Sequence, residues 1–215
     1  MRKCRSRAEG LLSDNEALLV AALAEARTAR SSRRRQCLAD EAGRFDAGRL
    51  PDDGGDLRRS LRASLLLERL FTFEWPARVS LGPRLELLAG LQRLASRAID
   101  PFSTRLPDMR INGRVGRALA VVVGELVHVA EAGARARPLW LQLIADWDDG
   151  FVLAFGAEGL DDAPVPTGSG AEALARARRI AQLLGGGIVR GFSDEWMCFG
   201  ITVDPALAPV PAVGA

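Results

Sequence analysis

His128 is the only histidine in the chain, and it stands between two carboxylates at helical spacing. Glu125 lies three residues before it and Glu131 three residues after it, so both fall on neighbouring positions of a helix. An imidazole in such a place can accept a phosphoryl group or shuttle a proton. The two carboxylates also favour the charged imidazolium and repel an incoming phosphoryl group. We therefore expect a partly exposed helix histidine paired with a glutamate, with phosphate acceptance as the open alternative.

A second candidate for phosphate chemistry is the short segment Gly168, Ser169 and Gly170, which directly precedes a helical pattern. The backbone amides of a glycine-rich segment at a helix N-terminus can hold a phosphate. The other interpretation is that these glycines only end the proline-rich loop before them. We expect the second interpretation to hold and keep the first as the alternative.

Metal-ligating patterns are weak in this chain. Five aspartates suggest a cluster at first sight: Asp146, Asp148, Asp149, Asp161 and Asp162. Asp148 and Asp149 precede Gly150 in a hairpin turn, so we expect their carboxylates to face solvent. Cys4, Cys37 and Cys198 show no Cys-x-x-Cys spacing, so no zinc set is expected. The run Arg33, Arg34 and Arg35 is interpreted as a solvated helix face, with an acidic partner as the alternative.

The composition is that of an ordinary globular protein, with 48% hydrophobic and 26% charged residues in a chain of 215. The 29 basic and 27 acidic residues nearly balance, which argues against a dedicated nucleic-acid binder. No apolar run approaches the ~20 residues needed to cross a bilayer, and no apolar signal segment follows the basic N-terminus. The odd number of cysteines suits a reducing compartment. We expect a soluble, cytoplasmic protein that binds neither membranes nor nucleic acid.

The N-terminal third carries two helical patterns joined by a segment rich in turn formers. Apolar residues of 11–38 form one stripe on a helix, and residues 13–16 either cap its start or are a polar step on a longer helix. Residues 45–56 predict the connecting loop. The second helix has a stripe of large apolar residues: Leu57, Leu61, Leu65, Leu66, Leu70 and Phe73. Two helices make a thin core, so we expect the hairpin to form a four-helix bundle with a second copy.

After Trp75 and Pro76, which end the second helix, helical and extended patterns alternate. We expect three helices, over residues 81–99, 114–134 and 171–184, and three glycines from Gly185 end the last of them. Extended segments are expected over residues 106–111, 139–147, 151–155, 188–192 and 197–203, and the last four form two hairpins. Residues 205–215 are expected to be a flexible tail. This order predicts an α+β fold with helices on one face of a mixed, mainly antiparallel sheet.

Residues 124–134 resemble the N-box of GHKL-type histidine kinases, roughly N-E-L-V-x-N-A-x-K-H-A, with matches at Glu125, Leu126, Val127, Ala130 and Ala134. Gly168 to Gly170 with the following helix is similar to the family's second glycine box, and residues 66–71 resemble the end of the dimerisation hairpin in the HWE and related subfamilies. The resemblance covers residues 8–204. It implies a dimerisation and phosphotransfer-like hairpin over residues 8–76 and a degenerate ATPase-like, Bergerat-type α/β sandwich over residues 77–204.

The departures from that family fall on residues that would carry ATP chemistry. The N-box asparagine, which orders magnesium, falls on Val129, which has no oxygen to offer a hard cation. The aspartate of the first glycine box, which accepts the adenine amino group, falls on Phe155, before Gly156 and Gly159. No histidine stands between residues 9 and 12, where the phospho-acceptor would lie. Losing two polar anchors costs several kcal/mol of binding free energy, so we expect no ATP chemistry.

The resemblance implies a two-component signalling protein. We expect a catalytically degenerate homodimer that is not an enzyme, needs no cofactor and acts by binding a response-regulator receiver domain or a kinase. In this interpretation Glu125 is a remnant of the N-box, and a vestigial nucleotide loop remains at Gly159, Gly168, Ser169 and Gly170. One alternative is a divergent histidine kinase or histidine phosphotransferase that still binds ATP and magnesium or relays phosphate, with His128 as the phospho-acceptor. Another is a GHKL-fold module with an unrelated ligand in the former nucleotide cleft.

Overall fold

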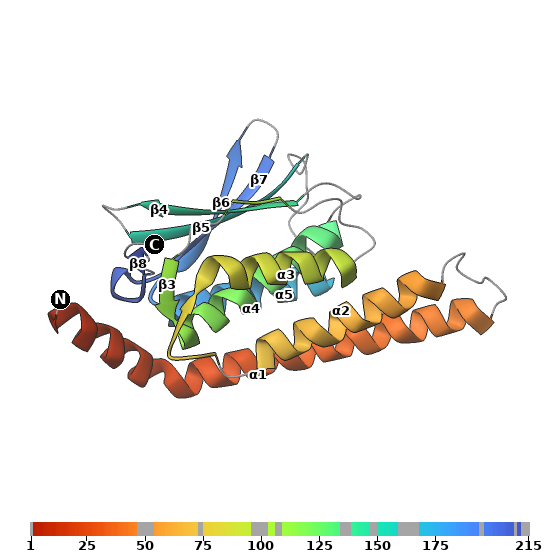
Figure 1. Ribbon diagram of the computed structural model, residues 1–215, viewed down its shortest axis with the longest axis horizontal. Helices are drawn as coiled ribbons and strands as arrows, with labels where there is room; N and C mark the ends of the chain where they lie inside the picture. Colours follow the sequence, from red (N-terminus) through yellow and green to blue (C-terminus); the bar gives the residue numbers. More distant parts are fainter. Residues whose placement is uncertain are drawn as a thin grey trace.

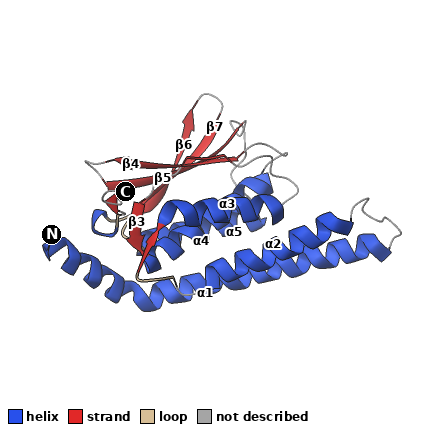
Figure 2. Cartoon of the chain, in the orientation of Figure 1, coloured by secondary structure: helices blue, strands red, loops and turns tan. Residues whose placement is uncertain are grey.

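Three layers build the molecule: a helical hairpin, a layer of three helices, and a sheet (Figure 1). In the computed structural model, the backbone is described for residues 2–46, 54–72, 75–95, 103–105, 109–133, 139–146, 150–158, 168–193, 196–208 and 210–211. Figure 2 shows that helices make up two of the layers and that the strands gather in the third. Within the described residues, no helix combines the length and the apolar character that a bilayer crossing requires.

The hairpin consists of α1 (Arg2–Asp46) and α2 (Gly54–Thr72). α1 is longer at both ends than residues 11–38, and residues 13–16 are the predicted polar step on a longer helix. Asn15 Nδ2 donates to the carbonyl of Leu183 at 3.3 Å, and Glu16 pairs with Arg114 at 2.7 Å. These polar side chains are satisfied by the second half of the chain, so the helix continues through them.

The predicted apolar stripe of α2 is split between two faces. Leu70 is buried together with Ala63, Leu67 and Phe71, as residues three and four apart on a helix should be. Leu65, with 48% of its surface exposed, lies on another face. The expectation that all of these leucines share one side was wrong, because helix α3 covers the first face. The side chains of Leu57 and Phe73 lie outside the described residues.

Helices α3 (Leu81–Ala95), α4 (Gly113–Gly133) and α5 (Gly168–Leu183) form the middle layer. The larger sheet has the order β2-β4-β5-β7-β6, in which β2 pairs parallel with β4 and the other neighbours are antiparallel. Its strands are β2 (Ser103–Arg105), β4 (Leu139–Asp146), β5 (Gly150–Glu158), β6 (Gly187–Ser193) and β7 (Trp196–Thr202). The predicted mixed, mainly antiparallel sheet is confirmed.

A smaller sheet has the order β1-β3-β8 and was predicted only in its central strand. Its strands are β1 (Arg78–Ser80), β3 (Met109–Asn112) and β8 (Val210–Pro211). β8 comes from the C-terminal segment, where Pro205–Leu207 forms the short helix η1 with Leu207 buried. Residues 205–207 and 210–211, which were expected in a flexible tail, form η1 and the strand β8, and β8 pairs with β3.

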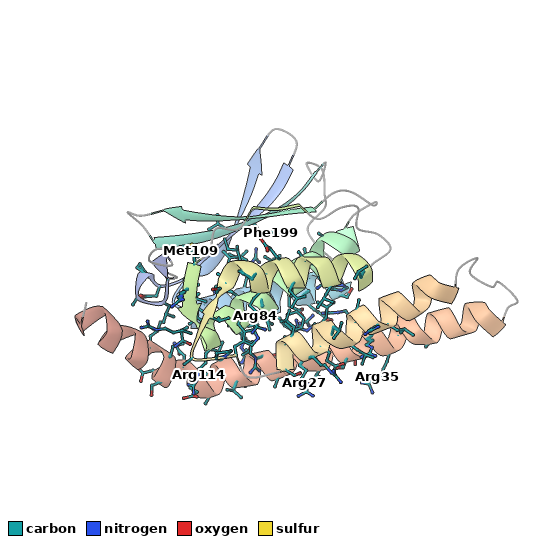
Figure 3. The ribbon with its side chains drawn as sticks, viewed as in Figure 1. Arg27, Arg35, Arg84, Met109, Arg114 and Phe199 are labelled. Atoms are coloured by element: carbon teal, nitrogen blue, oxygen red, sulfur yellow. The ribbon has the colours of Figure 1, made fainter. Side chains whose placement is uncertain are left out.

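Helix α4 lies at the centre of the molecule and is buried on nearly all sides. Its side chains are buried from Ala118 to Val127, a pattern expected of a helix that has packed neighbours all round. On one side lies the sheet, which contributes Phe199 (Figure 3) to the core, and on the other side lie α1 and α2. The hairpin therefore covers the face of α4 that the sheet leaves open.

The end of α5 follows the predicted glycine signal. Gly185 has φ +71°, and its amide donates to the carbonyl of Gln182 at 2.9 Å, while the amide of Gly186 donates to the carbonyl of Ala181 at 3.1 Å. This pair of bonds is the Schellman motif, which satisfies the last carbonyls of a helix. It turns the chain directly into β6.

Candidate functional site

Glu125 is fully buried in α4 and is held by arginines from two other helices. Arg176 of α5 donates from Nε to Oε2 at 3.0 Å, and its Nη2 forms an ion pair with the same oxygen at 2.9 Å. Arg33 of α1 donates from Nη2 to Oε1 at 3.1 Å. Burying a carboxylate is costly unless it is paired and hydrogen-bonded, and here both oxygens are engaged. The N-box remnant thus joins the hairpin to the middle layer.

Arg30 is a third arginine beside the same carboxylate, with its Nε 4.0 Å from Glu125 Oε1. Its guanidinium stacks over the ring of Phe71, 3.9 Å from the ring centroid. Burial lowers the pKa of Arg30 to about 10; Glu125 acts against this shift, and the like charges of Arg33 and Arg176 add to it. Three arginines around one carboxylate leave the region with a positive excess.

The run Arg33 to Arg35 is not a solvated face, and that expectation was wrong for its first two members. Arg33 bonds Glu125, and Arg34 Nη1 donates to Glu68 Oε2 of α2 at 2.9 Å. Only Arg35 is exposed, where it donates to Ser32 Oγ at 3.4 Å. The acidic partner kept as the alternative is present within the chain itself.

A cavity of about 170 Å³ lies where α1 and α2 meet α3 and α4. Its lining residues come from all four helices: Arg27, Arg30, Ser31, Arg33, Arg34, Ser64, Leu67, Glu68, Phe71, Thr72, Gln92, Gly124 and His128. Arg30 Nη1 and Arg34 Nε are buried here without a hydrogen-bond partner among the described residues. Each such donor costs about 1–3 kcal/mol when it is left unsatisfied.

Gly124 lets the backbone of α4 come close to the guanidinium of Arg30. A Cβ at this position would lie 3.2 Å from Arg30 Nη1 and 3.1 Å from Phe71 Cζ. Glycine inside a helix costs about 0.5–1 kcal/mol relative to alanine, so its presence here needs a reason. The close approach of Arg30 and Phe71 supplies that reason.

His128 lies one turn after Gly124 and also borders the cavity. Its Nε2 is 3.3 Å from Ser169 Oγ, in the first turn of α5. Glu125, expected beside it, instead gives both oxygens to arginines, and the side chain of Glu131 lies outside the described residues. The structure thus brings together two predicted site residues, His128 and Ser169, that are 41 positions apart in the chain.

The other predicted nucleotide-site residues do not gather around this cavity. Gly168 (φ +55°) and Gly170 belong to the first turn of α5, with Gly168 exposed and Gly170 buried. Gly159 lies outside the described residues. Val129, at the position of the magnesium-ordering asparagine, is only 2% exposed. Phe155 lies on β5, paired in register with Phe199 of β7.

For the aspartates, Asp148, Asp149, Asp161 and Asp162 fall outside the described residues, as does the side chain of Asp146. In the part of the chain that is described, no three His, Cys, Asp or Glu side chains are grouped as a metal site would need.

Sequence reasoning missed Arg30 and Arg176. A signal for Arg30 was present, because the buried positions of α1 continue at helical spacing into the arginines: Leu19, Ala22, Leu23, Ala26, Arg30 and Arg33. An arginine on the buried stripe of a helix requires a buried partner. Arg176 carried the same signal, because it stands at helical spacing from Ala173 and Ile180 on the apolar stripe of its helix.

No family model matches the chain, and no curated protein matches it either. Among solved structures, it is similar to a bacterial phosphotransferase at 14% identity and a TM-score of 0.51, covering 87% of this chain and 95% of that one. It is also similar to a blue-light activated histidine kinase of Erythrobacter litoralis, at 17% identity and a TM-score of 0.49, covering 85% of this chain and 63% of that one. A histidine kinase of Burkholderia phymatum matches at 15% identity and a TM-score of 0.47, over 99% of this chain and 100% of that one.

The chain thus spans less than two thirds of the blue-light activated kinase that it matches. At these identities the similarity concerns the fold alone, and the phosphotransferase, with its TM-score above 0.5, carries it. The helical hairpin followed by an α/β sandwich, expected from the resemblance, is present in order: α1 and α2, then the helix layer and the five-stranded sheet. The chain shares the fold of that bacterial phosphotransferase.

Proposed function

We propose that this chain is a two-component signalling protein that has lost ATP chemistry and acts as a homodimer by binding a receiver domain or a kinase. The observation that carries the proposal concerns two N-box residues of α4, Glu125 and Val129. Glu125 is bound to Arg33 and Arg176, and Val129 is a buried apolar residue. Neither side chain is free to order a metal ion and a triphosphate, so the residues of α4 do not fit a magnesium-bound nucleotide.

The hairpin supports the homodimer. Leu65 and Leu66 of α2 are large apolar side chains that remain exposed, although Leu67 and Leu70 of the same helix are buried. In a histidine-kinase-like hairpin the second copy supplies the missing face of the bundle. The exposed leucines therefore suit a four-helix bundle between two copies.

The decisive test is calorimetry of ATP binding to the full chain, with and without magnesium. We expect no magnesium-dependent affinity tighter than ~100 μM, which is on the order of −5.5 kcal/mol. A tighter, magnesium-dependent affinity would contradict the proposal and support a divergent kinase. Capture of purified receiver domains by the immobilised chain then separates a signalling partner from a module with an unrelated ligand.

The second candidate is a histidine phosphotransferase, and one similarity favours it. The phosphotransferase structure is matched over 95% of its length, so hairpin and sandwich correspond together. The only histidine of this chain lies on α4 rather than on the hairpin, which is the argument against it. Incubation with a phosphorylated receiver domain decides: transfer of phosphate to the chain would favour this second candidate.

A further inference from the structure

The cavity between the hairpin and α4 concentrates positive charge. Four of its lining residues are arginines, and Glu68 is the one carboxylate among the lining residues that the structure describes. Glu68 pairs with Arg34, and Glu125, just beyond the lining, pairs with Arg33. Counting both carboxylates, the cavity still carries two more positive charges than negative ones. Arg27 is exposed to water, so the unfavourable buried charge is that of Arg30, and an anion in the cavity would offset it.

Two buried donors point to where that anion sits. Arg30 Nη1 and Arg34 Nε have no hydrogen-bond partner among the described residues, and both belong to side chains that line the cavity. Arg30 is only 18% exposed and is held by Phe71, so its guanidinium cannot turn out to water without breaking that stacking. Two unsatisfied donors thus belong to side chains that line the same cavity.

We propose that this cavity binds a phosphate-bearing anion, with Arg30 and Arg34 as its principal ligands and Arg27 at its mouth. Phosphate carries close to two negative charges at neutral pH and offers several acceptor oxygens in different directions, which suits donors from separate arginines. The size agrees, because a cavity of about 150 Å³ holds a molecule as large as benzene. Arg27 is exposed, so the cavity reaches solvent on that side.

Gly124 and His128 of the N-box line the site, whereas the residues of the second glycine box do not. The helices α1 and α2 of the hairpin contribute most of its lining. A bound anion would join α1 and α2 to α4, so its binding would strengthen the docking of the hairpin on the sandwich. This inference does not depend on the proposed signalling function.

The test is calorimetry of the full chain with inorganic phosphate and, separately, with magnesium-free ADP, at constant ionic strength. We expect saturable phosphate binding with a dissociation constant of ~1 mM or tighter. Arg30→Met, which keeps the aliphatic stem, should weaken binding at least ~10-fold by removing a charged donor. Arg35→Met is the matched control, because Arg35 is exposed on the same helix and does not line the cavity; it should leave binding unchanged.

A second pair of variants, Gly124→Ala and Gly90→Ala, tests phosphate binding even if Arg30→Met does not fold. Gly124→Ala places a methyl group 3.2 Å from Arg30 Nη1 and should weaken phosphate binding without removing any charge. Gly90→Ala on α3 adds the same methyl group where nothing lies within 4 Å, and should have no effect.

Tighter binding of ADP than of phosphate, lost in the same variants, would identify a phosphate ester as the ligand; equal affinities would identify free phosphate. Absence of saturable binding of either probe would overturn the proposal. So would binding that both Arg30→Met and Gly124→Ala leave unchanged, because the anion would then sit elsewhere.

Discussion

Arg176 approaches Glu125 from α5 and brings two nitrogens to a single oxygen, with Nε hydrogen-bonded at 3.0 Å and Nη2 in an ion pair at 2.9 Å. The other oxygen is left to Arg33 of the hairpin, 92 positions away in the chain. One carboxylate therefore connects α1, α4 and α5, and the connection is made in the interior, where solvent screens it little.

Removal of the charge at Glu125 should destabilise the fold. In Glu125→Gln, Arg33 and Arg176 lose their counter-charge while they remain partly buried, so we expect a loss of about 3 kcal/mol in the free energy of unfolding. Urea denaturation measures it. Glu172→Gln is the control, because Glu172 is 72% exposed and lies 3.8 Å from Arg176 Nη1. It should change the free energy of unfolding by less than about 0.5 kcal/mol. Similar losses in the two variants would show that Glu125 is not the central counter-charge.

The free energy of unfolding of the wild type should rise relative to that of Arg30→Met as the pH becomes alkaline. Its pKa in the folded chain is about 10, below the ordinary 12.5, so the charged form is disfavoured by folding. Below pH 10 Arg30 is protonated in both the folded and the unfolded chain, so the full free-energy cost of burying its charge lowers the stability. Above that pH the folded state releases its proton first, so wild-type stability rises relative to that of Arg30→Met. The gain should reach about 1 kcal/mol by about pH 11.

Urea denaturation at about pH 9 and pH 11 measures this difference. The chain has no tyrosine and Lys3 as its single lysine, so few other side chains titrate in this range. Arg35→Met, lacking an exposed arginine, should follow the wild type at both pH values. A constant gap between wild type and Arg30→Met would mean that burial does not disfavour the charged form.

Leu65→Glu should weaken the homodimer while the single chain still folds. Leu65 is 48% exposed on α2, so a carboxylate there meets water in the monomer but would be buried in the proposed bundle. We expect the dissociation constant from sedimentation equilibrium to rise at least ~10-fold. Leu87→Glu on α3 is the control, because Leu87 is 49% exposed but lies outside the hairpin. A wild type that sediments as a monomer at micromolar concentration would remove the basis for the bundle.

His128→Gln should leave partner binding unchanged, and no acid-labile phosphate should accumulate on the wild type. His128 lies 3.3 Å from Ser169 and borders the arginine-lined cavity, a structural position between α4 and α5. The measurement starts from a receiver domain phosphorylated with radiolabelled phosphate and detects whether the label is transferred to the chain. Transfer to the wild type that is lost in His128→Gln would restore the phosphotransferase interpretation.

The sequence predicted the helices and long strands of the second half well, because their signals are local. The apolar pattern of α4 and the glycines after α5 need no information from the rest of the chain. The strands β1, β2 and β8 were missed because two or three residues carry no periodicity. Arg33 was misplaced in solvent for a different reason: its partner, Glu125, is brought to it only by tertiary packing. The apolar stripe of α1 indicated a buried position for this arginine, but the partner of a buried charge can be named only when the opposite element is known.

The central position of α4 has a consequence for how the molecule unfolds. Its side chains are buried by the sheet on one side and by α1 and α2 on the other, so neither covering layer can leave without exposing apolar surface of the same helix. Hairpin and sandwich should therefore melt in a single cooperative transition rather than as two independent units. A fragment without the hairpin would present the bare outer face of α4 to water and would tend to aggregate.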